Sequence, residues 1–414
     1  MMDTLLALLA LFNVISMLTV FVPRTFPDNA LPWFVFGFAL LATELAWIWL
    51  PLQIMLALLF VAGGALGSTL GWIALVVLLL SWPGLLHSLW LGLGSGRIVE
   101  AALANALGTD YPGQIPPAAA SRLRSRVSFN DWRHPFTMKR PDVEVIRNVA
   151  YADGGIRQQV DIYRPKVIPP QGCPVVLQIH GGGWIIGNKE DQALPLMYKL
   201  ASNGWICVAA NYRLSPSVGF PTHLHDCKAA LAWIRTHGRE YGMDPTFVAV
   251  TGGSAGGHLC ALMGLTANRT ELQPGHEGVD TSVQACVPFY GVYDMLNRSG
   301  ARPDTRKFFT FLGERVLHAS ATENRERWEL ASPVSQVHAD APPFMVLHGS
   351  CDSLAPVIDA RLFVRRLREV SKNPVAYVEL PGAEHAFEIM HSPRTEHAID
   401  GVERFLEWVR ATRS

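Results

Sequence analysis

The chain has 414 residues and carries 35 basic and 35 acidic side chains, so its formal net charge at neutral pH is zero. A balanced chain offers neither a basic surface for nucleic acid nor an acidic tail for a cationic partner, and we expect no nucleic-acid partner. The length exceeds that of one typical domain, which predicts two organisational units.

The first 96 residues are almost devoid of charge. Their four charged side chains are Asp3, Arg24, Asp28 and Glu44. Three stretches, 4–22, 31–60 and 70–92, are long and apolar enough to cross a bilayer, which takes about 20 residues. We therefore predict a multi-pass transmembrane region of about three helices, in which the Glu44 carboxyl faces other helices rather than lipid. A cleaved signal peptide at residues 1–22 and a buried helical domain are the alternatives.

The side of the membrane is predicted from arginines and cysteines. Four arginines follow the third apolar stretch: Arg97, Arg122, Arg124 and Arg126. With three spans, this bias places the larger C-terminal portion in the cytoplasm. The six cysteines show no paired spacing, as expected of reduced thiols, whereas N-glycosylation tripeptides at Asn268 and Asn297 favour the opposite side.

Residues 97–141 are predicted to be a linker and part of a cap, and residues 142–414 a catalytic domain. From residue 142 short strands alternate with amphipathic helices, which is typical of a mostly parallel sheet with helices on both faces. The eight predicted strands are residues 143–149, 157–163, 174–179, 205–211, 247–251, 283–289, 343–348 and 375–380. A polar stretch with interspersed aromatic residues, about 300–330, predicts a helical insertion.

The strongest motif is the run from Thr251 to Gly257, in which Ser254 lies between a predicted strand and a predicted helix. This is a G-x-S-x-G nucleophile elbow in its required context. The sharp turn strains the serine backbone, and Gly252 and Gly256 allow strand and helix to approach each other. The pattern predicts that Ser254 is a nucleophile.

A second motif, His180-Gly181-Gly182-Gly183-Trp184, directly follows the predicted strand 174–179. Consecutive glycines allow backbone N–H groups to point into a cavity and bind an oxyanion. We predict that the donors are Gly182, Gly183 and Ala255, the residue after the nucleophile.

A serine nucleophile needs a base that is itself oriented by an acid, and in this arrangement the acid precedes the base along the chain. Asp352 follows the strand 343–348, and His385 follows the strand 375–380, so both occupy the expected loops. We predict a Ser254, Asp352 and His385 triad. No Cys or His pairs have ligand spacing, so we predict no metal.

From residue 142 onward, the chain resembles the hormone-sensitive-lipase-related esterases and the acetyl-xylan and feruloyl esterase-like (BD-FAE-like) hydrolases, all of the α/β-hydrolase fold. The matching residues are His180 to Trp184, Asn211 to Pro216, Phe220-Pro221, Asp226, the Ser254 elbow and the Asp352 and His385 loops. Lipase-related members usually carry Asp before the nucleophile, whereas Gly253 resembles the second group. Arylacetamide deacetylases and prenylcysteine methylesterases similarly combine related catalytic domains with membrane segments.

The resemblance implies a serine carboxylesterase or lipase that hydrolyses acyl esters through an acyl-enzyme, without a cofactor. Its expected partners are a small-molecule or lipid ester and the bilayer. An acyltransferase that passes a lipid-derived acyl group to a hydroxyl, or a deacetylase of small acetylated substrates, would use the same triad. A non-catalytic membrane-anchored binding domain is a further alternative, disfavoured by the intact trio of motifs.

Overall fold

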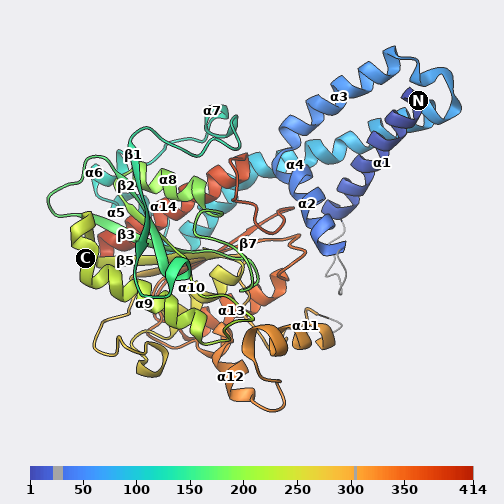
Figure 1. The fold of residues 1–414 in the computed structure, drawn as a ribbon. Helices are drawn as coiled ribbons and strands as arrows, with labels where there is room; N and C mark the ends of the chain where they lie inside the picture. The colour runs from blue at the N-terminus through green and yellow to red at the C-terminus, as the bar shows by residue number, and fades with distance from the viewer. Residues whose placement is uncertain (22–30, 303–304, 414) are drawn as a thin grey trace.

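The computed structural model describes residues 1–21, 31–302 and 305–413. A single eight-stranded sheet with the order β1-β2-β4-β3-β5-β6-β7-β8 forms its centre (Figure 1). β2 is antiparallel to both of its neighbours, β1 and β4, and the other described strand pairs are parallel. The strands are β1 (Val143–Ala150), β2 (Gln159–Pro165), β3 (Cys173–Ile179), β4 (Ile206–Ala210), β5 (Met243–Gly253), β6 (Ala285–Phe289), β7 (Phe344–Gly349) and β8 (Val375–Leu380). The predicted fold class, a mostly parallel eight-stranded sheet, is confirmed.

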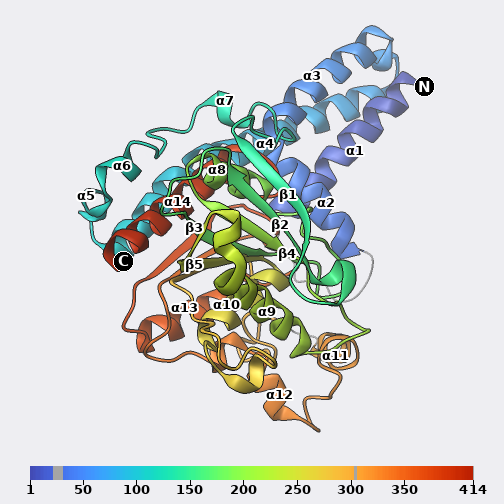
Figure 2. The same cartoon turned by 60° about the vertical axis from the view of Figure 1, so that its left-hand side comes forward.

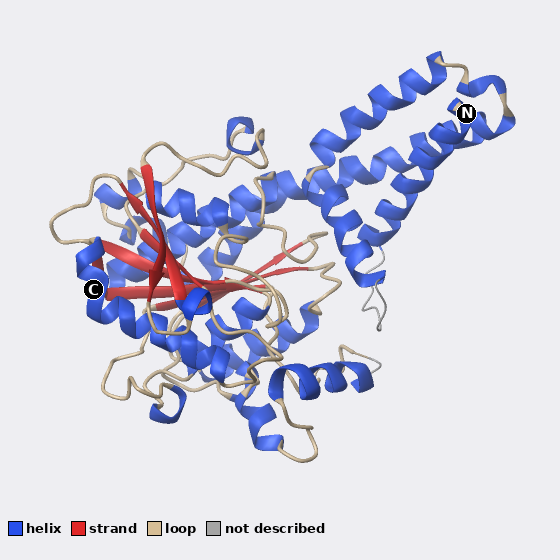
Figure 3. Ribbon diagram, in the orientation of Figure 1, coloured by secondary structure: helices blue, strands red, loops and turns tan. Residues whose placement is uncertain are grey.

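Helices cover both faces of the sheet (Figure 3). One hydrophobic core lies under α9 (Thr222–His237), α10 (Ala255–Leu265) and α13 (Val357–Val370). The other lies under α8 (Leu194–Ser202), α14 (Pro393–Arg413) and the second half of α4 (Thr69–Leu107). Because both faces are covered, the central strands β3 and β4 are buried along their whole length, which explains their continuous apolar sequences.

The remaining helices lie before the sheet and within the stretch 300–330. They are α1 (Met2–Phe21), α2 (Leu31–Glu44), α3 (Ala46–Ala62), α5 (Tyr111–Gln114), α6 (Pro117–Ala120), α7 (Phe129–Trp132), α11 (Thr305–Phe311) and α12 (Arg325–Leu330). Short 3-10 turns and a π-helical segment, Leu312–Leu317, join some of these elements. The stretch 300–330 is thus largely helical where it is described.

The N-terminal helices form an arm that projects from the catalytic domain (Figures 1 and 2). Helices α1, α3 and α4 pack through a small apolar cluster that includes Leu6, Ala57 and Leu78. Other large apolar side chains of the same helices point outward and are exposed, among them Leu58, Leu59 and Leu80. The arm therefore has an apolar exterior as well as an apolar interior.

The predicted span 31–60 is not one helix. The chain turns at Leu45, where φ is −110° and ψ is 16°, and α2 and α3 meet at 92°. Pro51 lies inside α3 and is not the point of the break. In the described parts of the chain, only α4 is long and apolar enough to cross a membrane by itself; counting the bent α2–α3 pair as one span gives at most two. The prediction of three spans is not supported.

Helix α4 extends well beyond the predicted stretch 70–92. Its 39 residues correspond to a length of about 58 Å. Its second half packs against α14, where an added Cβ at Gly96 would lie 2.7 Å from Nδ1 of His397. Residues 97–107, predicted to begin a linker, instead continue this helix along the catalytic domain.

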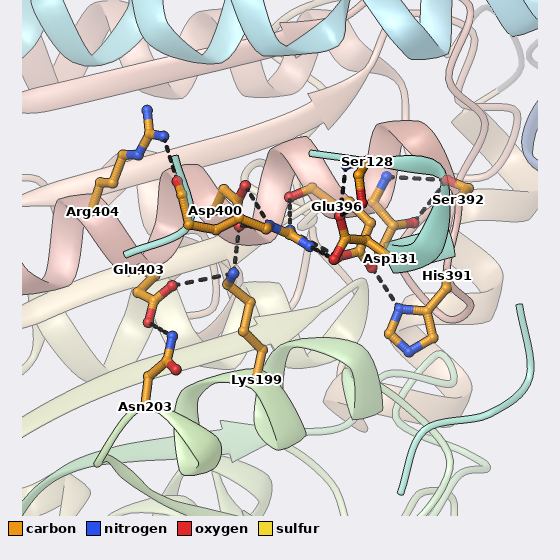
Figure 4. Close-up of polar contacts among 12 residues, drawn as sticks. Ser128, Asp131, Lys199, Asn203, His391, Ser392, Glu396, Asp400, Glu403 and Arg404 are labelled. Atoms are coloured by element: carbon orange, nitrogen blue, oxygen red, sulfur yellow. Dashed lines mark hydrogen bonds and ion pairs between the residues drawn. The ribbon is translucent and has the colours of Figure 1, made fainter. Parts of the chain in front are cut away.

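The segment after α4 is held to α14 by ion pairs (Figure 4). Arg124 contacts Asp131, Glu396 and Asp400, and Asp400 also binds Lys199 of α8. Because Arg124 and Lys199 both bind Asp400, these ion pairs form one network, and this network holds the part of the segment around Arg124 against α14.

Glu44 occupies a different environment from the one predicted. Its carboxylate is fully buried, binds the guanidinium of Arg394 and accepts a 2.7 Å hydrogen bond from the Ser392 hydroxyl. Arg394 lies in the first turn of α14, and Ser392 directly precedes that helix. Glu44 therefore connects α2 to the catalytic domain instead of facing the neighbouring helices of the arm.

Candidate active site

The predicted site residues lie on loops that leave the carboxyl ends of neighbouring parallel strands. Ser254 follows β5, Asp352 follows β7 and His385 follows β8, while the glycine loop follows β3. Parallel strands bring these ends to one edge of the sheet, where ligands bind in open α/β sheets.

The elbow at Ser254 is strained as predicted. Its φ is 58° and its ψ is −120°, a backbone conformation that L residues rarely adopt. An added Cβ at Gly252 would lie 2.5 Å from the carbonyl oxygen of Gly256, and one at Gly256 would collide with the Ile179 carbonyl. Both glycines are thus required by close backbone approach. Ser254 is partly exposed, and its hydroxyl makes no hydrogen bond to another described residue, His385 included.

The glycine loop lies against the elbow. An added Cβ at Gly181 would lie 2.9 Å from Cβ of Ser254, so the two motifs are in contact. Gly182 and Gly183 have φ values of 110° and 60°. The backbone N–H groups of Gly182, Gly183 and Ala255 donate no hydrogen bond within the described ranges, and Ala255 also begins α10, whose N-terminus favours negative charge. Three free donors therefore border the serine.

Buried aromatic side chains hold the glycine loop in place. The ring of His180 stacks on Tyr212 with centroids 4.4 Å apart, and the Tyr212 hydroxyl donates to the His180 carbonyl oxygen. Burial lowers the pKa of His180 to about 4, so this imidazole is neutral. Trp184 donates a 3.2 Å hydrogen bond to Nδ1 of His258, which in turn binds the Ala331 carbonyl. His180 and Trp184 thus have structural contacts that hold the glycine loop in place.

Asp352 and His385 are paired. Nδ1 of His385 lies 2.7 Å from one carboxylate oxygen of Asp352, and the other oxygen accepts hydrogen bonds from the backbone N–H groups of Leu354 and Ala355. Burial alone would raise the pKa of Asp352, but the imidazoles of His385 and His348 hold it well below its usual range. Asp352 is therefore ionised, and it fixes the orientation of the His385 ring.

Glu384, which the sequence did not single out, joins the two loops that carry this pair. One of its carboxyl oxygens accepts hydrogen bonds from the backbone N–H groups of Ser353, at 2.7 Å, and His385, at 2.8 Å. Burial and the nearby charge of Asp352 raise the pKa of Glu384 to about 8. The carboxyl group therefore holds its proton near neutral pH and leaves the negative charge on Asp352.

Tyr290 is a second residue that sequence motifs did not identify, although it directly follows β6. Its ring packs on the His385 imidazole with centroids 4.5 Å apart, and its hydroxyl donates to the buried Glu388. An added Cβ at Gly253 would lie 2.5 Å from this hydroxyl oxygen. The phenol thus occupies the space that a side chain before the nucleophile would need, which accounts for glycine at position 253.

One contact to the site comes from the N-terminal arm. The Phe36 ring of α2 meets the His385 imidazole edge to face, with centroids 6.3 Å apart. No motif could have indicated this contact, because the two residues are almost 350 positions apart. Across the described ranges, no group of three or more His, Cys, Asp or Glu side chains could hold a metal ion.

The sheet order, the strained serine after β5 and the Asp352–His385 pair on the loops after β7 and β8 define an α/β-hydrolase. A sequence model of the BD-FAE family matches residues 160–367, half of the chain. The chain belongs to the BD-FAE family and is a carboxylic ester hydrolase. Membership of this family agrees with the sequence analysis, in which Gly253 at the position before Ser254 resembles the acetyl-xylan and feruloyl esterase-like group.

Two relatives from Mycobacterium tuberculosis support this assignment. The probable carboxylic ester hydrolase LipM is 44% identical over 344 residues, which cover 80% of this chain and 76% of LipM. Esterase LipQ is 38% identical over 320 residues, covering 77% of this chain and 75% of LipQ. Residues 142–414 make up only about two thirds of the chain, so both similarities extend into the N-terminal region.

Solved structures share the fold. Esterase B from Lactobacillus rhamnosis (HN001) has a TM-score of 0.56 and 23% identity, and the similarity covers 75% of this chain and 96% of the esterase. A truncated carbohydrate esterase from gut microbiota has a TM-score of 0.54 and 23% identity, covering 63% of this chain and 96% of that protein.

Proposed function

We propose that the chain is a serine carboxylesterase in which Ser254 is the nucleophile, His385 the general base and Asp352 the residue that orients the base. The 2.7 Å hydrogen bond between Asp352 and Nδ1 of His385, on loops that leave the same edge of the sheet as the strained serine, carries this proposal. With Nδ1 occupied as a donor to Asp352, Nε2 is the nitrogen that accepts the serine proton.

The reaction proceeds in two halves. As Ser254 Oγ attacks the ester carbonyl carbon, its proton moves to His385, and the oxyanion is bound by the N–H groups of Gly182, Gly183 and Ala255. The protonated imidazole then gives its proton to the departing alkoxide, and the acyl group remains on Ser254. Water, deprotonated by His385, then attacks the acyl carbon; the bond to Ser254 Oγ breaks, the imidazole returns the proton to this oxygen, and the carboxylic acid is released.

Covalent labelling tests the assignment of the nucleophile. A fluorophosphonate probe is expected to modify Ser254, because the reaction needs an activated serine and free oxyanion donors. Peptide mapping by mass spectrometry should locate the adduct on Ser254, with no adduct in the Ser254→Ala variant. Labelling at another serine, or none in a folded preparation, would contradict the proposal.

Hydrolysis is preferred to acyl transfer because both relatives described above are named as ester hydrolases. The two reactions differ only in what attacks the acyl-enzyme. Analysis of products in the presence of a long-chain alcohol or a sugar acceptor distinguishes them, since a transferase yields a new ester instead of the free acid.

We also propose that the projecting arm associates with a membrane. The long apolar helix α4 and the exposed apolar side chains of α1, α3 and α4 support this proposal, since exposed apolar surface of this extent is costly in water. The cytoplasmic side is favoured by Arg97 and Arg126, which follow the apolar half of α4, and by the six free cysteines.

Charge substitutions on the arm test the membrane proposal. Leu58 and Leu80 are 65% and 75% exposed, and changing both to Glu should move most of the full-length protein from carbonate-washed membranes to the soluble fraction. Ile156 and Val167, which are 65% and 85% exposed on the catalytic domain, form the matched control pair. If the two double variants were divided equally between the membrane and soluble fractions, anchoring through the arm would be contradicted.

A further inference from the structure

Helix α2 leaves the arm and lies beside the candidate active site. The 92° bend at Leu45 separates it in direction from α3, and its Phe36 ring reaches the His385 imidazole. Leu40 and Leu45 are buried with Met390, a residue of the loop that follows His385. One side of the histidine is thus bordered by an apolar helix that belongs to the N-terminal region.

Buried polar contacts fix α2 in this position. Glu44, the last residue of α2, binds both Ser392 and Arg394. Arg394 also donates a 3.3 Å hydrogen bond to the carbonyl oxygen of Pro381. Pro381 and Ser392 lie on either side of His385 in the chain, so the end of α2 is tied to both ends of the loop that carries the base.

The position of α2 has a chemical meaning in an ester hydrolase of this mechanism. After the carbonyl is attacked, the protonated histidine gives its proton to the oxygen of the leaving alcohol. That oxygen must therefore lie next to the imidazole. The rest of the alcohol then extends past the side chains that border the imidazole. The α2 side chain that contacts the imidazole is the Phe36 ring.

We infer that α2 forms the binding surface for the alcohol portion of the ester and that Phe36 selects apolar alcohols. This inference rests on the proposed serine esterase function. The described α2 side chains next to the loop of His385 are the Phe36 ring and the buried Leu40, and the Glu44 carboxylate is bound to Arg394 and Ser392. The substrates are accordingly esters of long-chain or aromatic alcohols, and a polyol leaving group would gain nothing from Phe36.

Two ester series measured on the full-length protein test this inference. In the first, the acyl group is acetyl and the alcohol lengthens from ethanol to octanol. In the second, the alcohol is p-nitrophenol and the acyl group lengthens from acetyl to octanoyl. Values of kcat/KM are compared because they report the steps up to acylation, in which the alcohol leaves.

Phe36→Ala is expected to lower the ratio of kcat/KM for octyl acetate to that for ethyl acetate by about tenfold or more. The dependence on acyl length should stay within about twofold of the wild type. Phe36→Leu, which keeps an apolar side chain, should restore part of the alcohol preference. Melting temperature and the fluorophosphonate labelling rate show that each variant is folded and that its serine is reactive.

Two matched variants control for general effects. Leu59→Ala removes a 60% exposed side chain from α3, and Phe129→Ala removes a 55% exposed ring from α7. Neither should change the alcohol ratio. If Phe36→Ala leaves this ratio unchanged, or lowers all esters equally, or if Phe36→Ala and Phe36→Leu both fail to fold, the selection role is overturned.

Failure of this inference can be distinguished from failure of the proposed function. If Ser254 is labelled and required but the alcohol ratio is insensitive to Phe36, only the role of α2 is wrong. If Ser254→Ala hydrolyses both series as fast as the wild type, the serine mechanism is wrong, and the assignment of the leaving-group side is withdrawn with it.

Discussion

Ser254→Ala is expected to lower kcat for p-nitrophenyl acetate by about 10⁶-fold, the typical loss when the nucleophile of a serine triad is removed. The variant lacks the oxygen that forms the acyl-enzyme, while the oxyanion donors and the Asp352–His385 pair stay in place. Residual catalysis of about 10³-fold over water is expected from those groups. Alanine inherits the same positive φ as serine, so the melting temperature should change little. Steady-state hydrolysis by purified protein measures the effect.

Ser282→Ala is the control for this experiment. Ser282 precedes β6 and therefore lies at the opposite edge of the sheet, where its hydroxyl binds Asp280. Its removal should leave kcat within about twofold of the wild type, as expected for a surface substitution away from the site. Wild-type rates in Ser254→Ala, after contaminating esterases have been removed, would refute the nucleophile assignment.

Asp352→Asn should lower kcat by about 10⁴-fold with little loss of structure. The asparagine oxygen can still accept the hydrogen bonds of Leu354 and Ala355. Its amide would then face Nδ1 of His385 and donate to it, which places the imidazole proton on Nε2. A histidine in that tautomer cannot accept the proton of Ser254, so the base is lost although the geometry is kept. The measurements are kcat and melting temperature.

Asp294→Asn provides the comparison, because Asp294 is another buried aspartate that follows a central strand. Its carboxylate pairs with Arg298 and with backbone N–H groups, and it has no contact with His385. We expect Asp294→Asn to lower stability and to leave the kcat of the folded protein within about tenfold. If kcat fell more in Asp294→Asn than in Asp352→Asn, the acid of the triad would be misassigned.

Much of the catalytic domain could be predicted because its signals are local. Continuous apolar runs such as Val175 to Ile179 identify buried strands, and Gly252 and Gly256 identify a tight strand-to-helix turn wherever they occur together with a serine. The strand 375–380 has its predicted bounds, but most other strand ends were misplaced, by up to four residues, because hydrophobicity does not show where the ladder of hydrogen bonds stops. The positions of Ser254, Asp352 and His385 relative to their strands did not depend on those ends.

The surroundings of the triad could not be predicted because they depend on contacts between distant parts of the chain. Nothing near Glu44 reveals that its partner is Arg394, and nothing near Phe36 reveals His385. Hydropathy alone also treated residues 31–60 as one span, whereas the burial of Glu44 in the catalytic domain accompanies a sharp turn at Leu45. Tyr290 and Glu384 were missed for the same reason, since their roles arise from the neighbours that folding supplies.

The buried pair of Glu44 and Arg394 bears on attempts to obtain a water-soluble form of the enzyme. Deleting the first hundred or so residues would remove the counter-ion of the Arg394 guanidinium, and loss of one partner of a buried ion pair typically costs about 3–5 kcal/mol. That is a large fraction of the roughly 5–15 kcal/mol by which a native protein is stable. Truncation would also strip Val99 and Leu103 from the core beneath α14. Substituting the exposed leucines of the arm with polar residues should therefore preserve the fold better than deleting the arm.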